Sequence, residues 1–121
     1  MENLDRNLAK LDKEMKSGMM SLLVLMILKK EEGPSYGYSI IRRLKELSSE
    51  SLNFQDGTIY PVLRSLQKQG LVKSFWEESN NGPPRRYYDL TSLGTTVAEK
   101  GLKLWRDLVE TTDKMLLELE G

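Results

Sequence analysis

Apolar residues recur at helical spacing along the first part of the chain. Near its beginning they stand three or four positions apart, at Leu4, Leu8, Leu11 and Met15. This spacing predicts an amphipathic helix over residues 1–16, because positions three and four apart share one face of a helix. The nearly unbroken apolar run over residues 19–28 predicts a second, mostly buried helix that ends before Gly33-Pro34. A third amphipathic helix is expected over residues 36–47, fraying into residues 48–51.

The position of Pro61 decides where the next helix is expected to begin. Proline is tolerated in the first turn of a helix, where backbone N–H groups lack partners, and is costly further in. With Thr58 as the N-cap, Pro61 falls in that first turn, whereas a cap at Asp56 would cost one backbone hydrogen bond. We therefore expect the helix to start after Thr58 and to end at Gly70, which suits the left-handed C-terminal position.

Two strand-like segments follow, at residues 71–76 and 85–90, and both are rich in aromatic and β-branched residues. Residues 79–84 between them combine serine, asparagine, glycine and proline, which is typical of a hairpin loop. Thr91 is a suitable N-cap for a last helix of about 28 residues. The apolar positions of that helix are Val97, Leu104, Trp105, Leu108, Met115, Leu116 and Leu119.

This order of elements predicts a mainly α-helical fold with a small β-hairpin, of the α+β class. Three helices followed by a hairpin are the winged helix-turn-helix arrangement, in which the third helix enters the major groove of DNA. We expect an N-terminal helical arm at residues 1–17, the winged helix-turn-helix domain at residues 18–91 and a C-terminal dimerisation helix at residues 92–121.

One face of the expected third helix suits DNA. Its core side is expected to be formed by Ile59, Val62, Leu63 and Leu66. The opposite side and its flanks carry two cations, several hydroxyl groups and no carboxylate. The candidate DNA-contacting residues on this helix are Thr58, Tyr60, Pro61, Arg64, Ser65 and Lys68.

These candidates are expected to differ in what they contact. The first turn, with Thr58, Tyr60 and Pro61, is the part of a recognition helix that reaches base edges. Arg64 is suited to read guanine or to hold a phosphate, while Lys68 is suited to the phosphate backbone. From this face alone, an ordinary solvated helix surface is an equally good interpretation.

The hairpin favours DNA binding over that interpretation. Arg85 and Arg86 stand beside a proline-stiffened loop tip, where a wing reaches the flanking backbone or the minor groove. Glu77 and Glu78 lie on the opposing strand and are placed to pair with these arginines in the free protein. Such pairing would weaken the wing as a source of cations.

The first and last helices carry apolar stripes that one small domain cannot cover. The last helix alone is about 40 Å long at a rise of 1.5 Å per residue. Pairing both helices with their copies in a twofold dimer would cover the stripes and place two recognition helices about 34 Å apart. The residues expected in this interface are Leu4, Leu8, Leu11, Leu104, Trp105, Leu108, Met115 and Leu119.

Composition narrows the function further. The 121 residues include no cysteine and no histidine, which excludes disulfides and removes the commonest general base and zinc ligand. A glycine-rich phosphate loop and metal-ligand spacing are also missing, so we expect neither an enzyme nor a cofactor or metal.

The apolar run at residues 19–28 is about half the roughly 20 residues of a membrane span. We therefore expect a cytoplasmic protein without a membrane segment.

The formal net charge of zero is unevenly distributed. Residues 57–90 carry five basic and three acidic side chains, whereas residues 92–121 carry four basic and six acidic ones. The middle of the chain is therefore mildly basic, which favours a DNA-binding face there.

Several segments resemble the PadR-like transcriptional regulators. These segments are Tyr36–Ile41, Asp56–Leu63, Gly70–Val72 and the wing run Gly82–Thr91. The resemblance extends over roughly residues 18–95 and implies a homodimeric repressor whose two winged-helix domains read a palindrome. It also implies that Tyr60, Arg85 and Arg86 contact DNA, and that Tyr38 contacts a phosphate. The C-terminal tail resembles the short subgroup with a single C-terminal helix.

Two alternatives from other functional classes stay open. The chain is also compatible with a winged-helix module that docks proteins, which its zero net charge favours. A third possibility is a small apolar effector bound between subunits near Trp105 and Met115, unless Trp105 only packs in the dimer core. Effector binding is compatible with DNA binding, because it can change the spacing of the recognition helices.

Overall fold

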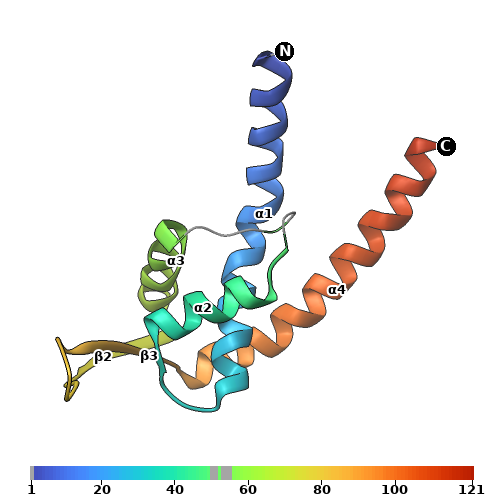
Figure 1. The fold of residues 1–121 in the computed structure, drawn as a ribbon. Coiled ribbons are helices and arrows are strands. Elements are labelled where there is room, and N and C mark those ends of the chain that lie inside the picture. The colour runs from blue at the N-terminus through green and yellow to red at the C-terminus, as the bar shows by residue number, and fades with distance from the viewer. Residues whose placement is uncertain (1, 50–51, 53–55) are drawn as a thin grey trace.

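The computed structural model describes residues 2–49, 52 and 56–121. Its first element, α1 (Glu2–Glu31), is one continuous helix where the sequence predicted two. Gly18 does not interrupt the helix, because a glycine inside a helix costs only about 1 kcal/mol. The C-terminal half of α1 is held by the core, while side chains 2–15 are all exposed. In Figure 1 this N-terminal half projects away from the rest of the molecule.

Two further helices pack against the buried half of α1. They are α2 (Gly37–Leu47) and α3 (Asp56–Lys68), and the bounds of α2 agree with the prediction. The expected fraying of residues 48–51 lies partly outside the described residues, but Ser48 and Ser49 follow the helix without regular structure. The most deeply buried side chains are Val24, Leu28, Ile40, Ile59, Leu63, Leu66 and Val72. The core is therefore formed by α1, α2, α3 and the adjoining strand.

The predicted start of α3 is wrong. The helix already includes Asp56, so Pro61 lies inside it and Thr58 is not its N-cap. Proline cannot donate the hydrogen bond that the Gly57 carbonyl would otherwise accept. Both Gly57 and Pro61 are exposed, so water can replace the missing donor at this carbonyl. Starting the helix before Thr58 therefore costs little at this exposed position.

A three-stranded antiparallel sheet lies beside α3. Its strands are β1 (Ser35–Tyr36), β2 (Val72–Glu77) and β3 (Arg85–Leu90), arranged in the order β1-β3-β2. The β2–β3 hairpin was predicted, and so was the left-handed conformation of Gly70, which has a φ of 78°. The two-residue strand β1 was not predicted. Helices plus this small sheet confirm the α+β class and the winged helix-turn-helix arrangement.

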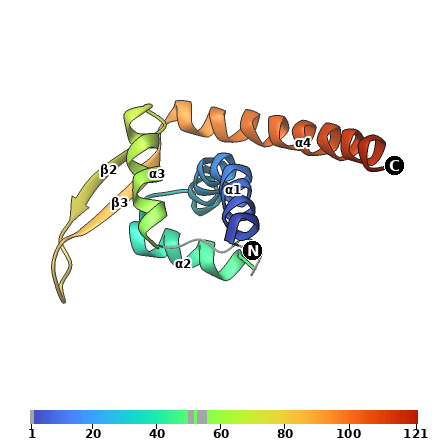
Figure 2. The same ribbon diagram turned by 90° about the horizontal axis from the view of Figure 1, so that it is seen from above.

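Thr91 caps the last helix, α4 (Ser92–Glu120), as predicted. Its Oγ1 accepts a hydrogen bond from the Gly94 backbone N–H at 3.0 Å and donates one to the Gly70 carbonyl at 2.7 Å. Beyond its first turns α4 leaves the body of the molecule, and side chains 106–121 are all exposed. Figure 2 shows the hairpin and the free end of α4 pointing in opposite directions. No helix among the described residues is long and apolar enough to span a membrane.

Candidate nucleic-acid interface

The outward face of α3 carries six of the residues predicted to contact DNA. Its inner face is fixed by Ile59, Leu63 and Leu66, each at most 1% exposed. Because helix faces alternate with a period of 3.6 residues, burial of these three turns the remaining positions towards solvent. The predicted residues Thr58, Tyr60, Pro61, Arg64, Ser65 and Lys68 are all exposed. The Ser65 hydroxyl accepts a hydrogen bond from the Gln69 side chain at 3.1 Å.

A cleft of about 500 Å³ separates α3 from the hairpin. Four residues predicted to contact DNA line it: Tyr60 and Arg64 from α3, and Arg85 and Arg86 from β3. The cleft therefore combines three arginines and a tyrosine from two elements far apart in sequence. Such a wall of guanidinium groups and aromatic rings suits the phosphates and sugars of a nucleic acid backbone.

Gly37 lies against the rings of Tyr88 and Tyr60 at the start of α2. A Cβ atom at Gly37 would lie 3.2 Å from Cε2 of Tyr88 and 3.5 Å from Cε1 of Tyr60. Glycine at the start of α2 therefore leaves room for the Tyr88 ring, while the Tyr60 ring would be in ordinary contact with a Cβ. Tyr60 is still 44% exposed, so its ring contacts the protein on one side and faces solvent on the other.

The two wing arginines are held in different ways. Arg86 is half-buried, and its Nε and Nη2 atoms donate to the Ser74 hydroxyl at 3.2 and 2.8 Å. Arg85 is exposed, and its guanidinium carbon lies 4.9 Å from the centre of the Tyr36 ring. Among the described residues, neither arginine forms an ion pair with Glu77 or Glu78. Neither wing arginine is thus held in an ion pair with these carboxylates, although Glu77 is the cross-strand partner of Arg85 in the sheet register.

The remaining predicted DNA-contacting residues lie outside the cleft. Tyr38, on the first turn of α2, is 54% exposed, and its ring centre lies 6.3 Å from that of Tyr36. The other four are on the exposed face of α3, beside the cleft: Thr58, Pro61, Ser65 and Lys68. The structure therefore gathers eight of the nine predicted residues into the cleft and the adjoining face of α3, while Tyr38 lies on α2, outside both.

The sequence interpretation did not include Tyr36 and Trp76, which also line the cleft. Trp76 is 64% exposed at the outer end of β2, and the guanidinium carbon of Arg86 lies 5.5 Å from its ring centre. Its neighbour Phe75 is also aromatic, so alternation along the strand cannot tell which of the two faces α3. The register of the sheet decides between them. Trp76 pairs directly with Arg86, whose guanidinium binds the Ser74 hydroxyl on the side of the sheet that faces α3.

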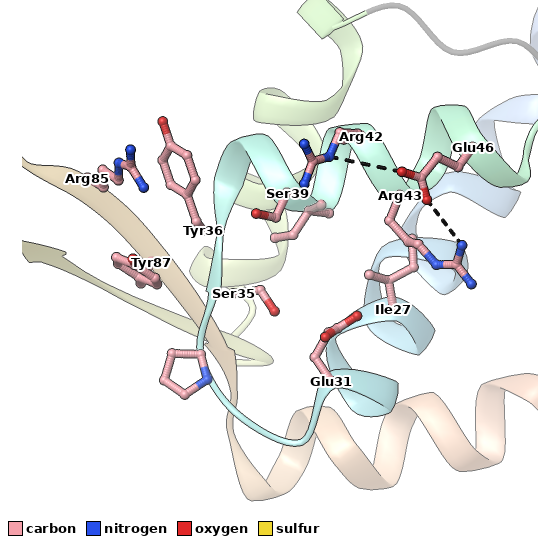
Figure 3. Close-up of a pocket in the computed structure, with 12 residues that line it drawn as sticks. Ile27, Glu31, Ser35, Tyr36, Ser39, Arg42, Arg43, Glu46, Arg85 and Tyr87 are labelled. Atoms are coloured by element: carbon pink, nitrogen blue, oxygen red, sulfur yellow. Dashed lines mark hydrogen bonds and ion pairs between the residues drawn. The ribbon is translucent and has the colours of Figure 1, made fainter. Parts of the chain in front are cut away.

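A second cavity, of about 440 Å³, lies on the side of the sheet that carries Tyr36 and Tyr87 (Figure 3). Arg42 and Arg43 of α2 line it, and both pair with one carboxylate. This is the carboxylate of Glu46, whose Oε1 lies 4.0 Å from Nε of Arg42 and whose Oε2 lies 3.3 Å from Nη1 of Arg43. Because Glu46 offsets part of their charge, this cavity is less suited to a nucleic acid backbone than the cleft beside α3.

The residues predicted for a dimer interface lie on the two projecting helix segments. Seven of them are between 49% and 76% exposed in the single chain: Leu4, Leu8, Leu11, Leu104, Leu108, Met115 and Leu119. Trp105 is half-buried and lines an apolar groove of about 270 Å³ between α1 and α4, together with Leu22 and Leu108. Two long apolar stripes are thus left uncovered by the chain itself.

Comparison with known proteins identifies similar chains. Residues 24–100 match the transcriptional regulator PadR-like family. A PadR family transcriptional regulator from Eggerthella lenta is 28% identical, with 96% of this chain and 97% of that chain covered and a TM-score of 0.73. A PadR-like transcription factor from Bacteroides fragilis is 35% identical, with 88% and 98% covered and a TM-score of 0.69. An uncharacterized protein of Lysinibacillus sphaericus is 28% identical over 100 residues, which are 83% of this chain and 89% of that protein.

Proposed function

Since the chain belongs to the PadR-like family of transcriptional regulators, we propose that it acts as a homodimeric repressor on a palindromic operator. Membership of this family makes it a DNA-binding regulator rather than an enzyme. The cleft between α3 and the wing carries this proposal, because it joins Tyr60 and Arg64 to Arg85 and Arg86. In a winged helix, the third helix enters the major groove and the wing reaches the flanking backbone.

The proposal divides the chain into three functional parts. Residues 18–91 bind DNA, and the segments 1–17 and 92–121 form the dimer interface. Two observations support this division: side chains 2–15 and 106–121 are all exposed, and both segments carry apolar stripes. A soluble chain rarely leaves apolar stripes of this length uncovered. A twofold dimer covers both and presents two copies of α3 to consecutive turns of one DNA face.

Enrichment of bound sequences from random duplex DNA at two salt concentrations tests the proposal. We expect a palindrome whose half-sites lie about one helical turn apart, with an affinity that falls steeply with salt. Absence of an enriched sequence, or binding that salt does not weaken, would instead favour a protein-docking module.

A matched pair of arginine variants makes this test specific to the cleft. Arg64→Ala removes a cation from the cleft, and Arg106→Ala removes an exposed cation from α4. If Arg64 contacts a phosphate in each half-site, its loss from both protomers lowers the slope of log affinity against log salt by about two, while Arg106→Ala leaves the slope unchanged. Equal slopes for the parent chain, Arg64→Ala and Arg106→Ala would contradict the assignment of Arg64 as a phosphate contact.

A second candidate function is binding of a small apolar effector beside Trp105. The apolar groove of about 270 Å³ between α1 and α4 favours it, because its walls are mainly aliphatic. Trp76→Phe leaves Trp105 as the single tryptophan of the chain, so its fluorescence reports on this groove alone. Saturable quenching by planar apolar compounds is expected if the groove binds them, and a linear, unsaturable response would exclude the compounds tested.

A further inference from the structure

One hydroxyl group links the recognition helix to the wing. The Ser74 Oγ atom of β2 donates a hydrogen bond to Oε1 of Gln67 on α3, at 2.9 Å. The same oxygen accepts two hydrogen bonds from the guanidinium of Arg86 on β3, at 3.2 Å from Nε and 2.8 Å from Nη2. A serine hydroxyl has one hydrogen and two lone pairs. All of its hydrogen-bonding capacity is therefore used to join α3, β2 and β3.

The register of the sheet explains why these groups meet. Ser74 pairs with Tyr88 and Trp76 pairs with Arg86. Directly opposed residues share a face of the sheet, and so do residues two positions apart. All four side chains therefore face α3, and Arg86 is the diagonal neighbour of Ser74. A serine in this place leaves space for the long arginine side chain and offers it an acceptor.

Aromatic rings hold the guanidinium of Arg86 in addition to this hydroxyl. Its central carbon lies 5.5 Å from the ring centre of Trp76 and 5.9 Å from that of Tyr88. Both distances are within the range of cation–π attraction. A free arginine side chain carries about 2 kcal/mol of rotamer entropy that binding would otherwise have to remove. Arg86 has already given up much of this freedom in the unbound protein.

We propose that Gln67 and Ser74 are positioning residues for DNA binding: they fix Arg86 in the cleft and hold the wing at a set distance from the recognition helix. This inference rests on the proposed DNA-binding function of the cleft. Arg85 serves as the contrast, because the aromatic ring of Tyr36 is its partner and no hydrogen bond within the described part of the chain ties it to α3. Arg86 is therefore a preorganised cation, and Arg85 adapts to the DNA.

A double-mutant cycle tests the inference. Ser74→Ala removes the linking hydroxyl, Ser74→Thr retains it, and Arg86→Ala removes the group that the hydroxyl positions. We expect Ser74→Ala to bind the enriched palindrome about tenfold more weakly, equivalent to about 1.4 kcal/mol, since preorganisation is lost. Ser74→Thr should stay within about twofold of the parent chain, because β-branched residues suit a strand. In an Arg86→Ala background, Ser74→Ala should change the affinity by less than about twofold.

A purely structural role for Ser74 gives a different pattern. It predicts that Ser74→Ala weakens binding equally with and without Arg86, in proportion to the loss of thermal stability of each variant. That additive result, or parent-like affinity of Ser74→Ala, would overturn the inference while leaving the proposed function intact. If the parent chain itself enriches no DNA sequence, both the proposed function and the inference fall. A Gln67→Leu variant adds a check from the helix side and is expected to lose affinity in the same Arg86-dependent way.

Discussion

Thr91 offers a sharp test of how α4 is attached to the DNA-binding body. Its hydroxyl accepts from the Gly94 N–H and donates to the Gly70 carbonyl, and its own N–H donates to the Leu71 carbonyl at 3.1 Å. Thr91→Val keeps the shape of the side chain and the backbone bond but removes both hydroxyl contacts. The variant therefore isolates the contribution of one oxygen atom at the junction of three elements.

The structure sets the size of the expected loss. Gly94 is buried, so water cannot replace the lost acceptor of its N–H, and an N-cap of this kind is worth about 1 kcal/mol. Gly70 is exposed, so its carbonyl can turn to water and adds at most about 1 kcal/mol. We expect Thr91→Val to lower the free energy of unfolding by about 1 to 2 kcal/mol. At this chain length that is a fall in Tm of about 4 to 8 °C.

Thermal unfolding followed by circular dichroism measures this loss. One fixed protein concentration is used, because the Tm of the proposed dimer would depend on concentration. Thr91→Ser is the matched control, since serine caps helices at least as well as threonine. It should melt within about 2 °C of the parent chain. A Thr91→Val variant that melts with the parent, or a Thr91→Ser variant that loses as much as valine, would refute the reasoning.

Two further predictions address the cleft and the projecting helices. Gly37→Ala places a Cβ 3.2 Å from the Tyr88 ring and should destabilise the fold by about 1 kcal/mol through overpacking, measured by thermal melts. In the control Gly57→Ala, the new Cβ meets no atom of the described residues within 4 Å, and the variant should be neutral or slightly stabilising. Similar losses for both variants would contradict the packing argument. Leu108→Glu combined with Met115→Glu should yield monomers with much weaker DNA binding, and sedimentation that still gives a dimer would reject the proposed interface.

The elements predicted correctly from the sequence each carry their own local signal. Two segments rich in aromatic and β-branched residues around a glycine- and proline-containing loop indicate the hairpin. Gly70 marks the end of one helix and Thr91 marks the start of the next. Such signals depend on backbone preferences within a few residues. They do not need a distant partner, and so the order of elements and the winged-helix class could be recognised in advance.

The elements that were missed depend on contacts across the chain. The strand β1 has two residues, and only its pairing with Tyr87 and Tyr88 of β3 makes it a strand. The early start of α3 is tolerated because Gly57 and Pro61 are exposed, so that water can replace the donor that Pro61 lacks. Local rules failed in both places, since a pairing partner and the exposure of a residue are set by how the whole chain packs.

The same distinction applies within the candidate site. Arg64, Arg85 and Arg86 could be named from residue type and position, because exposed cations on a third helix and a wing have a known use. Ser74 and Gln67 could not, since each is an ordinary polar residue until the register of the sheet places the hydroxyl between the amide and the guanidinium. Residues that position others are recognised only from geometry.

The turn around Thr91 also connects stability to operator recognition in the proposed dimer. Its hydrogen bonds to Gly70 and Leu71 tie the start of α4 to the segment that directly follows α3, so the two helices move together. The 29 residues of α4 form a lever of about 43 Å. A rotation of about 5° at this turn would displace the far end by about 4 Å, a large shift against the 34 Å between half-sites. Thr91→Val should therefore broaden the half-site spacing that the dimer accepts, an effect that a loss of stability alone does not produce.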